Sequence, residues 1–406
     1  MQYSKKVGDI MKTKNINFVV LQFKKNILPA IFILFTICLI LFSKTNLSAA
    51  KDGLSLWVNS VLPSLFPFFI ATELLGYTSV VSNLGKLLSF IMKPLFNVPG
   101  EGAFAFLMGI ISGTPMGAKI ATDFYQKGIT TKEESERLLS FTNNSGPLFI
   151  IGTVGISLFC DTLSGYLLLF THILACITVG FLFRFWKYSK NETYIPSTLS
   201  YNTKTKSISL GQMLSSSINN SIQTIVMIGG FIVLFSVIIS ILKQSHVLYL
   251  LGTLISPFLN LFGIETSFST PFITGIFELT NGIKNVSMVV TKNISTSLTL
   301  CSFLLGFGGI SIGLQVLSIV SKTDLSIAPY FIGKLLQGFF SAIYTFTMIK
   351  MFPIFNLDLQ SVSTSLVSPI FKQYTSNLPY LSFTILAFIL FWIIKCNLLK
   401  RKCIKL

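Results

Sequence analysis

The stretch FTNNSGPLFIIGTVG, residues 141–155, sets polar, small and helix-breaking residues between two apolar segments. Pro147 ends or kinks a helix and removes a backbone donor, and Gly146 permits backbone angles that other residues avoid. The short polar side chains before them are suited to capping backbone groups that leave the helix. Inside a membrane such backbone must be buried in protein or line a wet cavity, because lipid offers no hydrogen-bond partner. The stretch therefore predicts a discontinuous helix whose freed amide groups point into a cavity and attract anions.

The composition indicates a polytopic membrane protein. Of the 406 residues, 51% are hydrophobic, 11% are charged and 39 are Phe, and the mean hydropathy is +0.73. Such a chain has too few polar residues to build a water-facing surface, so the expected fold is all-α with several membrane helices. A spanning helix needs about 20 mostly apolar residues. Four runs meet or approach this length: residues 27–42, 165–186, 225–242 and 378–399.

Basic residues lie in three patches beside the apolar runs. The formal net charge is +17, and the patches fall at residues 5–25, 184–206 and 395–405. By the positive-inside rule all three patches face the cytoplasm, which places both the N- and C-termini there. The basic C-terminus also favours contact with anionic membrane lipid. The patches form no continuous face that tracks phosphates, so no nucleic acid partner is expected.

No grouping of residues predicts an enzyme, a metal site or a cofactor site. The six cysteines show no CxxC spacing, and His172 and His246 stand alone in the sequence. The stretch GTPMGAK from Gly113 is spaced too tightly for a phosphate-binding loop. We therefore expect no catalytic residues, no metal and no cofactor, and the sequence leaves a homo-oligomer open.

Two related repeats are predicted from letters that recur in order. Pro94, Asn97 and Gly100 match Pro257, Asn260 and Gly263 at one constant offset. GIISGTPMGAK from Gly109 then matches GIFELTNGIK from Gly275, and SFTNNSGPLFIIG from Ser140 matches SFLLGFGGISIG from Ser302. Chance similarity of apolar sequences is the alternative, but the ordered Pro, Asn, Gly and Lys favour duplication. Each repeat is expected to hold a Gly/Pro-broken re-entrant hairpin and a discontinuous helix.

This pattern divides the chain into five expected parts. They are a basic N-terminus with a first membrane helix (1–50), a first repeat (51–186), a cytoplasmic linker (187–209), a second repeat (210–353), and a last membrane helix with a basic C-terminus (354–406).

Paired breaks in equivalent places of two halves are the best sequence pointer to a transport site. Ionisable residues at membrane depth are also functional candidates by default. The substrate-binding candidates are Thr142, Asn143, Asn144, Ser145, Gly146 and Pro147 at the first break, Gly113, Pro115 and Lys119 in the preceding hairpin, and Glu278, Thr280, Asn281 and Lys284 at the second break. Glu73 and Glu278 are candidates for ion coupling, and Gln315 and Lys334 are further polar candidates.

Two alternatives apply to these candidates. In one alternative, the first break is a kinked helix, and its polar residues serve only to form hydrogen bonds with one another. Lys119 and Lys284 occupy matched positions, so a pseudo-symmetric fold would let them face one site from two sides. Otherwise both lysines extend to the membrane interface.

Three motifs resemble the YlbJ (SpoVV) family of sporulation integral membrane proteins, whose members carry the nucleoside-recognition or Gate domain. They are PSLFPFFIATELL from Pro63, SGTPMGAK from Ser112 and EESERLLSFTNNSGPLFIIGTVG from Glu133, and the resemblance covers residues 60–348. Thr114 departs from the family pattern, where Tyr or another residue is expected. The resemblance implies a carrier of dipicolinic acid from the mother cell across the outer forespore membrane, with both termini on the mother-cell side.

Dipicolinate is a planar dianion, so its site needs donors for two carboxylates and a face for the ring. The backbone of residues 143–146 with Lys119 and Lys284 would supply the donors, and Phe141 and Phe149 the face. A nucleoside carrier is the alternative within transport, with Asn143, Asn144, Glu278 and Asn281 as its expected ligands. A non-transporting scaffold for sporulation proteins is the alternative from another class.

Overall fold

A computed structural model describes residues 27–187, 209–291 and 294–351, and these residues form helices and connecting turns without a strand. The expected all-α fold is confirmed. The two outer basic patches, nearly all of the linker at 187–209 and the expected last helix at 378–399 lie outside the described residues.

The first half of the described chain contains ten helical segments, and π-helical segments are written η. They are a helix at Ile27–Leu41, α2 (Ser43–Leu56), η1 (Trp57–Val61), α3 (Leu62–Gly76), α4 (Val80–Phe96), α5 (Gly102–Ile111), α6 (Met116–Gln126), α7 (Lys132–Phe141), η2 (Leu148–Leu158) and α8 (Thr162–Phe183).

The second half begins with a long helix and includes one short 3-10 segment, η3. Its elements are α9 (Leu210–Gln244), α10 (Val247–Leu261), η3 (Thr266–Phe268), α11 (Ser269–Phe277), α12 (Leu279–Ser287), α13 (Ile294–Phe307), α14 (Gly309–Val320) and α15 (Ala328–Met351).

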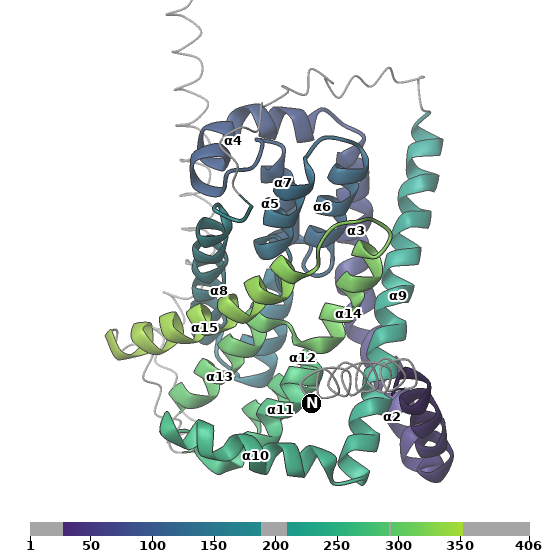
Figure 1. The fold of residues 1–406 in the computed structure, drawn as a ribbon, viewed down its shortest axis with the longest axis vertical. Coiled ribbons are helices and arrows are strands. Elements are labelled where there is room, and N and C mark those ends of the chain that lie inside the picture. The colour runs from purple at the N-terminus through teal and green to yellow at the C-terminus, as the bar shows by residue number, and fades with distance from the viewer. Residues whose placement is uncertain (1–26, 188–208, 292–293, 352–406) are drawn as a thin grey trace, which may run out of the picture. The chain divides into compact units, whose positions relative to one another are not determined.

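The two halves repeat one series of elements. Each has a long helix, a helix with an internal proline, a hairpin of two short helices, a broken helix and a second long helix. The internal prolines are Pro94 in α4 and Pro257 in α10, the pair matched by the sequence. Figure 1 shows α4 at the upper end and α10 at the lower end, with α5, α6 and α7 above and α11, α12 and α13 below. The two hairpins therefore enter from opposite ends, which makes the repeats inverted.

Glycines hold both hairpins together at the same place. A Cβ on Gly282 in α12 would overlap the backbone of Gly275 in α11. In the first hairpin Gly109 and Gly117 lie against each other, and a Cβ on either would overlap the carbonyl oxygen of Thr142. These glycines are the ones that the sequence comparison matched, so their recurrence reflects close backbone approach between helices.

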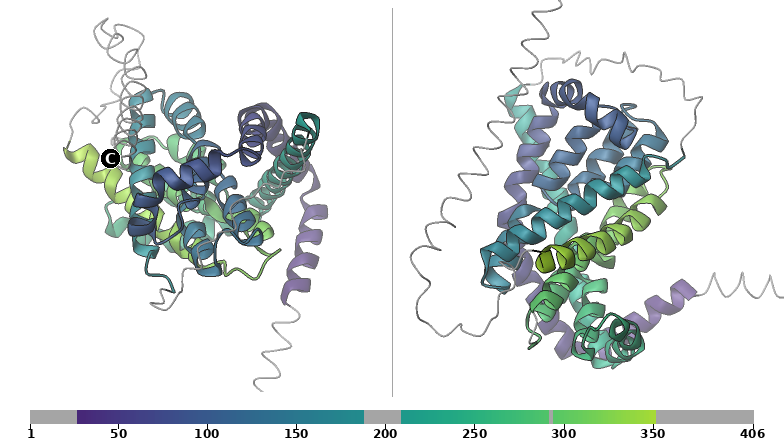
Figure 2. Two further views of the ribbon diagram at one scale, coloured as in Figure 1. Left: turned by 90° about the horizontal axis from the view of Figure 1, so that it is seen from above. Right: turned by 90° about the vertical axis from the view of Figure 1, so that its left-hand side faces the viewer.

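The broken and long helices of the two halves pack together. α15 contacts α7, α8 and α13, while α3 and α2 pack mainly on α9. Figure 2 shows α8 and α15 running beside each other. Buried aromatic rings fill the space around the first break, where Phe141 stacks on Phe96 with ring centroids 4.7 Å apart. The breaks therefore lie inside a packed core.

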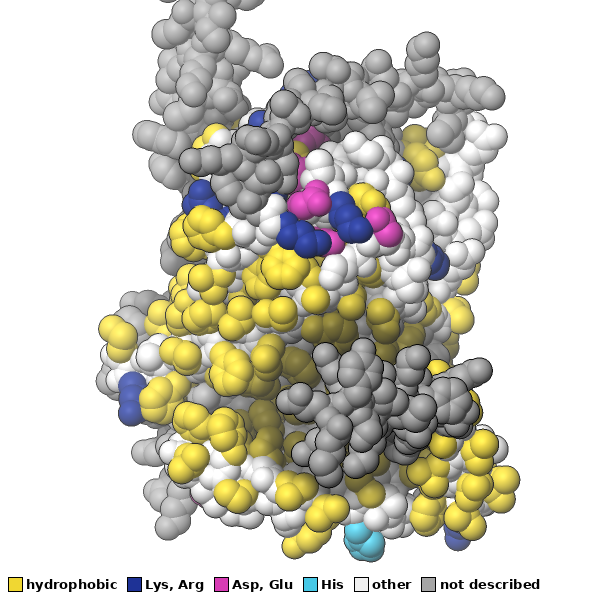
Figure 3. Space-filling view, viewed as in Figure 1, with side chains coloured by type: hydrophobic (Ala, Val, Ile, Leu, Met, Phe, Trp, Pro, Cys, Tyr) yellow, Lys and Arg dark blue, Asp and Glu magenta, His cyan; other side chains and the backbone are white. Residues whose placement is uncertain are grey.

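Three helical segments in the described part are long and apolar enough to span a membrane. They are α8, α9 and the α13–α14 segment Ile294–Val320, and a pair bent by 99°, Ile27–Leu41 with Ser43–Asn59, makes a fourth if it is one span. Figure 3 shows apolar side chains over the middle and lower part of one face, with Asp, Glu and most of the Lys and Arg in its upper part. Leu261 and Ile40 are 82% and 71% exposed, as suits side chains in contact with lipid.

Candidate functional site

The helices break at four places that lie deep in the fold. The hairpin turns are at residues 112–115 and at Glu278, and the broken helices open at residues 142–146 and at Gly308. Gly113 and Gly308 have φ angles of 80° and 84°, in the left-handed region that glycine adopts without a steric penalty. Both predicted breaks, at 142–147 and at Glu278, are present.

Three of these breaks line one cavity of about 180 Å³, which we call the central cavity. Its polar lining comes from the first hairpin turn, the first broken helix, the second hairpin turn and the start of α14. The residues are Gly113, Thr114, Ser145, Gly146, Thr153, Glu278, Thr280, Ser311 and Gln315. The apolar side includes Phe68 of α3, Phe149 of η2 and Ile228 of α9. Polar groups from distant parts of the chain thus converge on one apolar-walled space, as is common for small-molecule sites.

The two asparagines of the first break lie outside this cavity. Asn143 and Asn144 are fully buried. The Asn144 amide donates to the Phe141 carbonyl (2.9 Å), and its oxygen accepts from Gln337 Nε2 (2.8 Å). Of the six candidates at this break, Ser145 and Gly146 line the cavity, while Pro147 starts the next helix. The Asn144 side chain therefore forms hydrogen bonds with the backbone and with a neighbouring side chain, as the kinked-helix alternative predicts.

Lys334 of α15 connects the two broken helices. Its ammonium donates to the Asn143 carbonyl (2.9 Å) and to Gln337 Oε1 (2.8 Å), and the residue is 2% exposed. Its Cε lies 3.7 Å from where a Cβ would stand on Gly308. No Asp or Glu of the described residues forms an ion pair with it. The signal available from the sequence was a lysine within an apolar stretch, away from the end of its helix.

Gln337 extends this buried group to α8. Its Nε2 lies 3.4 Å from Nε2 of His172, which in turn accepts from the Ser145 amide (3.3 Å). His172 is thus a packing residue of the first break.

The second hairpin turn is closed by its own carboxylate. Glu278 caps α12 by accepting from the amides of Thr280 (2.9 Å) and Asn281 (2.8 Å). Glu278 and Thr280 line the central cavity, whereas Asn281 does not. Lys284 lies in the same helix but is exposed.

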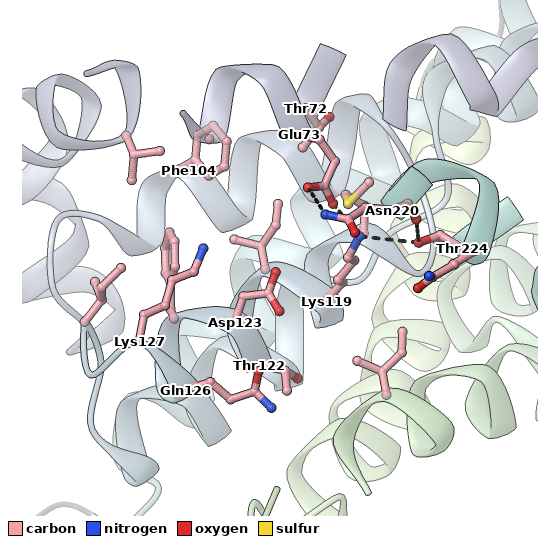
Figure 4. Close-up of a pocket in the computed structure, with 18 of the residues that line it drawn as sticks. Thr72, Glu73, Phe104, Lys119, Thr122, Asp123, Gln126, Lys127, Asn220 and Thr224 are labelled. Atoms are coloured by element: carbon pink, nitrogen blue, oxygen red, sulfur yellow. Dashed lines mark hydrogen bonds and ion pairs between the residues drawn. The ribbon is translucent and has the colours of Figure 1, made fainter. Parts of the chain in front are cut away.

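Lys119 lies in a second, larger cavity of about 450 Å³, which we call the outer cavity. Its ammonium pairs with the Glu73 carboxylate and lies 3.3 Å from Thr224 Oγ1. The other oxygen of Glu73 accepts from Asn220 Nδ2 (3.2 Å), as Figure 4 shows. Lys119 and Lys284 therefore share no cavity, and the expectation that both face one site is wrong.

The remaining candidates divide between packing and the cavities. Pro115 stands at the start of α6. Thr142 is buried, with its hydroxyl donating to the Leu138 carbonyl (2.8 Å). Phe141 is buried in the aromatic core, and Phe149 contributes an aromatic wall to the central cavity.

Known proteins match both halves of this chain. The model of the Gate family, described as nucleoside recognition, matches residues 58–183 and 225–326, more than half of the chain. The sporulation integral membrane protein YlbJ of Bacillus subtilis (strain 168) is 36% identical over 337 residues, which cover 80% of this chain and 82% of YlbJ. The chain belongs to the YlbJ family. No solved structure matches it.

Each Gate segment of this YlbJ-family chain contains one hairpin and one broken helix. The polar lining of the central cavity consequently comes from both segments. The family and the apolar helices agree that the chain is an integral membrane protein.

Proposed function

We propose that this protein carries dipicolinate from the mother cell across the outer forespore membrane during endospore formation. The observation that carries the proposal is the convergence of both hairpin turns and a helix break on one cavity. Non-helical backbone at membrane depth is tolerated where it lines such a cavity, and paired breaks of this kind mark substrate sites in transporters. The relative YlbJ is a sporulation membrane protein, which supports the biological setting.

The chemistry of the central cavity suits a small aromatic acid. Phe68 and Phe149 offer faces for a ring, and Thr114, Ser145 and Ser311 offer hydroxyl donors for carboxylate oxygens. The Lys334 side chain, which donates to the Asn143 carbonyl two residues before Ser145, lies behind these donors. Glu278 is the one acidic residue of the lining, and its carboxylate already accepts two backbone amides.

The proposed orientation rests on the charged turns at one end of the fold. Lys132 pairs with Asp324 (2.8 Å) and Lys187 with Glu136 (2.9 Å), next to where α8 enters the basic linker. The positive-inside rule assigns this end to the mother-cell cytoplasm. The outer cavity, with Lys127 and Lys322 in its lining, faces the same end.

The first test is dipicolinate measured separately in mother cell and forespore of a sporulating strain lacking the protein. We expect accumulation in the mother cell and a depleted forespore. Normal partition would overturn the proposed substrate. Uptake of labelled dipicolinate into liposomes carrying the purified full-length protein then isolates transport from other steps of sporulation.

A matched pair of variants tests the cavity itself. Thr153→Phe fills the central cavity, because Thr153 lines it, and should abolish liposome uptake. Gly152→Ala is the control, since a Cβ there meets only the Leu148 side chain at 3.8 Å. Equal uptake by a folded Thr153→Phe protein would show that substrate takes another route.

A nucleoside carrier remains the second candidate, and the Gate description of both segments favours it. Of the ligands expected for a nucleoside, Glu278 lines the central cavity, whereas Asn143, Asn144 and Asn281 do not. Excess uridine or adenosine should leave dipicolinate uptake unchanged. Competition would favour the nucleoside carrier, and a scaffold would show no uptake of either compound.

A further inference from the structure

The outer and central cavities lie one after the other along the same helices. Four helices, α3, α5, α9 and α14, line both. Three of them contribute a residue to each cavity four positions apart: Phe68 and Thr72 on α3, Ile228 and Thr224 on α9, and Gln315 and Ile319 on α14. Four residues are about one helical turn, so the outer cavity lies one turn further along the same three helices.

A side-chain hydrogen bond lies at the boundary between the two cavities. Thr72 Oγ1 and Ser112 Oγ are hydrogen-bonded at 2.8 Å, and the two residues are 3% and 0% exposed. Thr72 lines the outer cavity, and Ser112 directly precedes Gly113, which lines the central one. The bond therefore ties α3 to the first hairpin turn at the boundary.

The neighbouring ion pair has the chemistry of a carboxylate site. Lys119 Nζ and Asn220 Nδ2 both donate to the Glu73 carboxylate, which follows Thr72 in α3. The side chains of Lys119 and Glu73 are 19% and 16% exposed, so the pair lies partly buried at the edge of an open volume. Figure 4 shows the two donors converging on Glu73 from α6 and α9. Charge-assisted donors of this kind bind any carboxylate that reaches them.

The charges of the outer cavity favour an incoming anion. Its lining holds three lysines, Lys119, Lys127 and Lys322, against two acids, Glu73 and Asp123. Once an outside carboxylate takes the place of Glu73, the two donors stay satisfied, and Lys127 and Lys322 remain in the lining to offset its charge. A positively charged cleft also raises the local concentration of anions.

We propose that the outer cavity is a first binding station for dicarboxylates, in which a substrate carboxylate displaces Glu73 from Lys119 and Asn220. Release of Glu73 breaks the ion pair between α3 and α6. The adjacent Thr72–Ser112 hydrogen bond then still links α3 to the first hairpin turn. Binding of an anion thereby loosens the boundary to the central cavity. An uncharged nucleoside lacks the group that displaces Glu73. This inference rests on the proposed function, for which it supplies an anion-specific step.

The experiment measures dipicolinate binding to purified full-length protein in nanodiscs. Glu73→Gln removes the internal competitor while keeping the side-chain shape, and should tighten dipicolinate binding about tenfold, the effect of one charged hydrogen bond. Lys119→Gln should weaken binding by a similar factor. The uncharged analogue pyridine-2,6-dicarboxamide should respond to neither change.

Two further variants keep the test decisive. The double variant Glu73→Gln/Lys119→Gln leaves no unpaired charge and should fold normally, yet bind no more tightly than Lys119→Gln alone. Lys243→Gln, at an exposed position near the far end of α9, controls for net charge and should match wild type. Absence of dipicolinate uptake by wild type would overturn the proposed function. Equal affinities of wild type and Glu73→Gln would overturn this inference whether or not uptake occurs.

Discussion

The two hairpins of this protein share a backbone design but are held by different neighbours. In both, matched glycines let the two short helices cross closely, at Gly109 with Gly117 and at Gly275 with Gly282. The first hairpin is tied to α3 by Thr72–Ser112 and by Glu73–Lys119, whereas the second turn is capped by its own Glu278. Among the described residues the duplicated fold thus pairs the first hairpin with α3 through a charged contact, whereas the second hairpin turn caps itself, a difference that under the proposed function gives the carrier a distinct entrance side.

The largest expected effect tests what the hairpins share. Gly282→Val places side-chain atoms inside the backbone of α11, so α11 and α12 must separate. We expect loss of folded, monodisperse protein on detergent size exclusion, and the same result for Gly117→Val. Gly230→Ala, where a Cβ meets nothing within 4 Å, is the control. A folded Gly282→Val protein would mean that the close crossing is dispensable in the second half.

The next effect tests where the hairpins differ. Lys119→Gln should lower dipicolinate uptake about tenfold, because it removes a charged donor of the outer cavity. Lys284→Gln changes the matched but exposed lysine and should reduce uptake by less than about twofold, as is usual for a surface charge. Liposome uptake rates compare the two directly. Equal losses of uptake in the two variants would indicate that both lysines act at one site.

A smaller effect should follow from removing the cap of the second turn. Glu278→Ala leaves the Thr280 and Asn281 amides without their acceptor, and loss of such a cap costs about 1 kcal/mol. We expect a lower midpoint in thermal unfolding monitored by tryptophan fluorescence. Glu278→Asp, which keeps a carboxylate, should recover part of the loss. An unchanged midpoint for Glu278→Ala would show that water caps the helix equally well.

The smallest effect concerns a contact between the halves at the charged end. Hydrogen bonds from Lys132 and Tyr125 lower the pKa of Asp324 from 3.8 to about 2. A depressed carboxyl pKa adds stability above the unfolded value, and that stability is lost as pH falls from about 4 toward 2. Thermal midpoints of wild type and Asp324→Asn should therefore converge over this window. Parallel curves would show that the contact contributes nothing in solution.

The sequence predicted the positions of the breaks because their cause is local. Gly146 and Pro147 interrupt a helix wherever it lies, and Glu278 stands where a carboxylate caps the amides two and three positions later. The order of matched Pro and Gly residues also placed the two halves in register, and the structure repeats the same series of elements. These features depend on residues close together in the chain.

The roles of individual polar side chains depended on partners far along the chain. Gln337 donates to the Asn144 side chain and Lys334 to the backbone carbonyl of Asn143, about 190 positions away, so no local pattern showed that this break is bonded to α15. Likewise Glu73 and Lys119 meet across 46 positions. Lys284 has the same place in its repeat as Lys119 but pairs with no carboxylate among the described residues, a difference that matched letters conceal.

The buried lysine of α15 has a consequence for how the protein is assembled during synthesis. A lysine inside an isolated helix opposes entry of that helix into the bilayer, by about 3 kcal/mol at the helix centre and by less nearer its end. The Asn143 carbonyl accepts a hydrogen bond from Lys334, and Gly308 lies next to the Lys334 side chain. Both residues precede Lys334 in the chain. Both broken helices have therefore left the ribosome before Lys334 does. When α15 enters the membrane, Lys334 can bond to polar groups of these helices that are already present, instead of facing lipid.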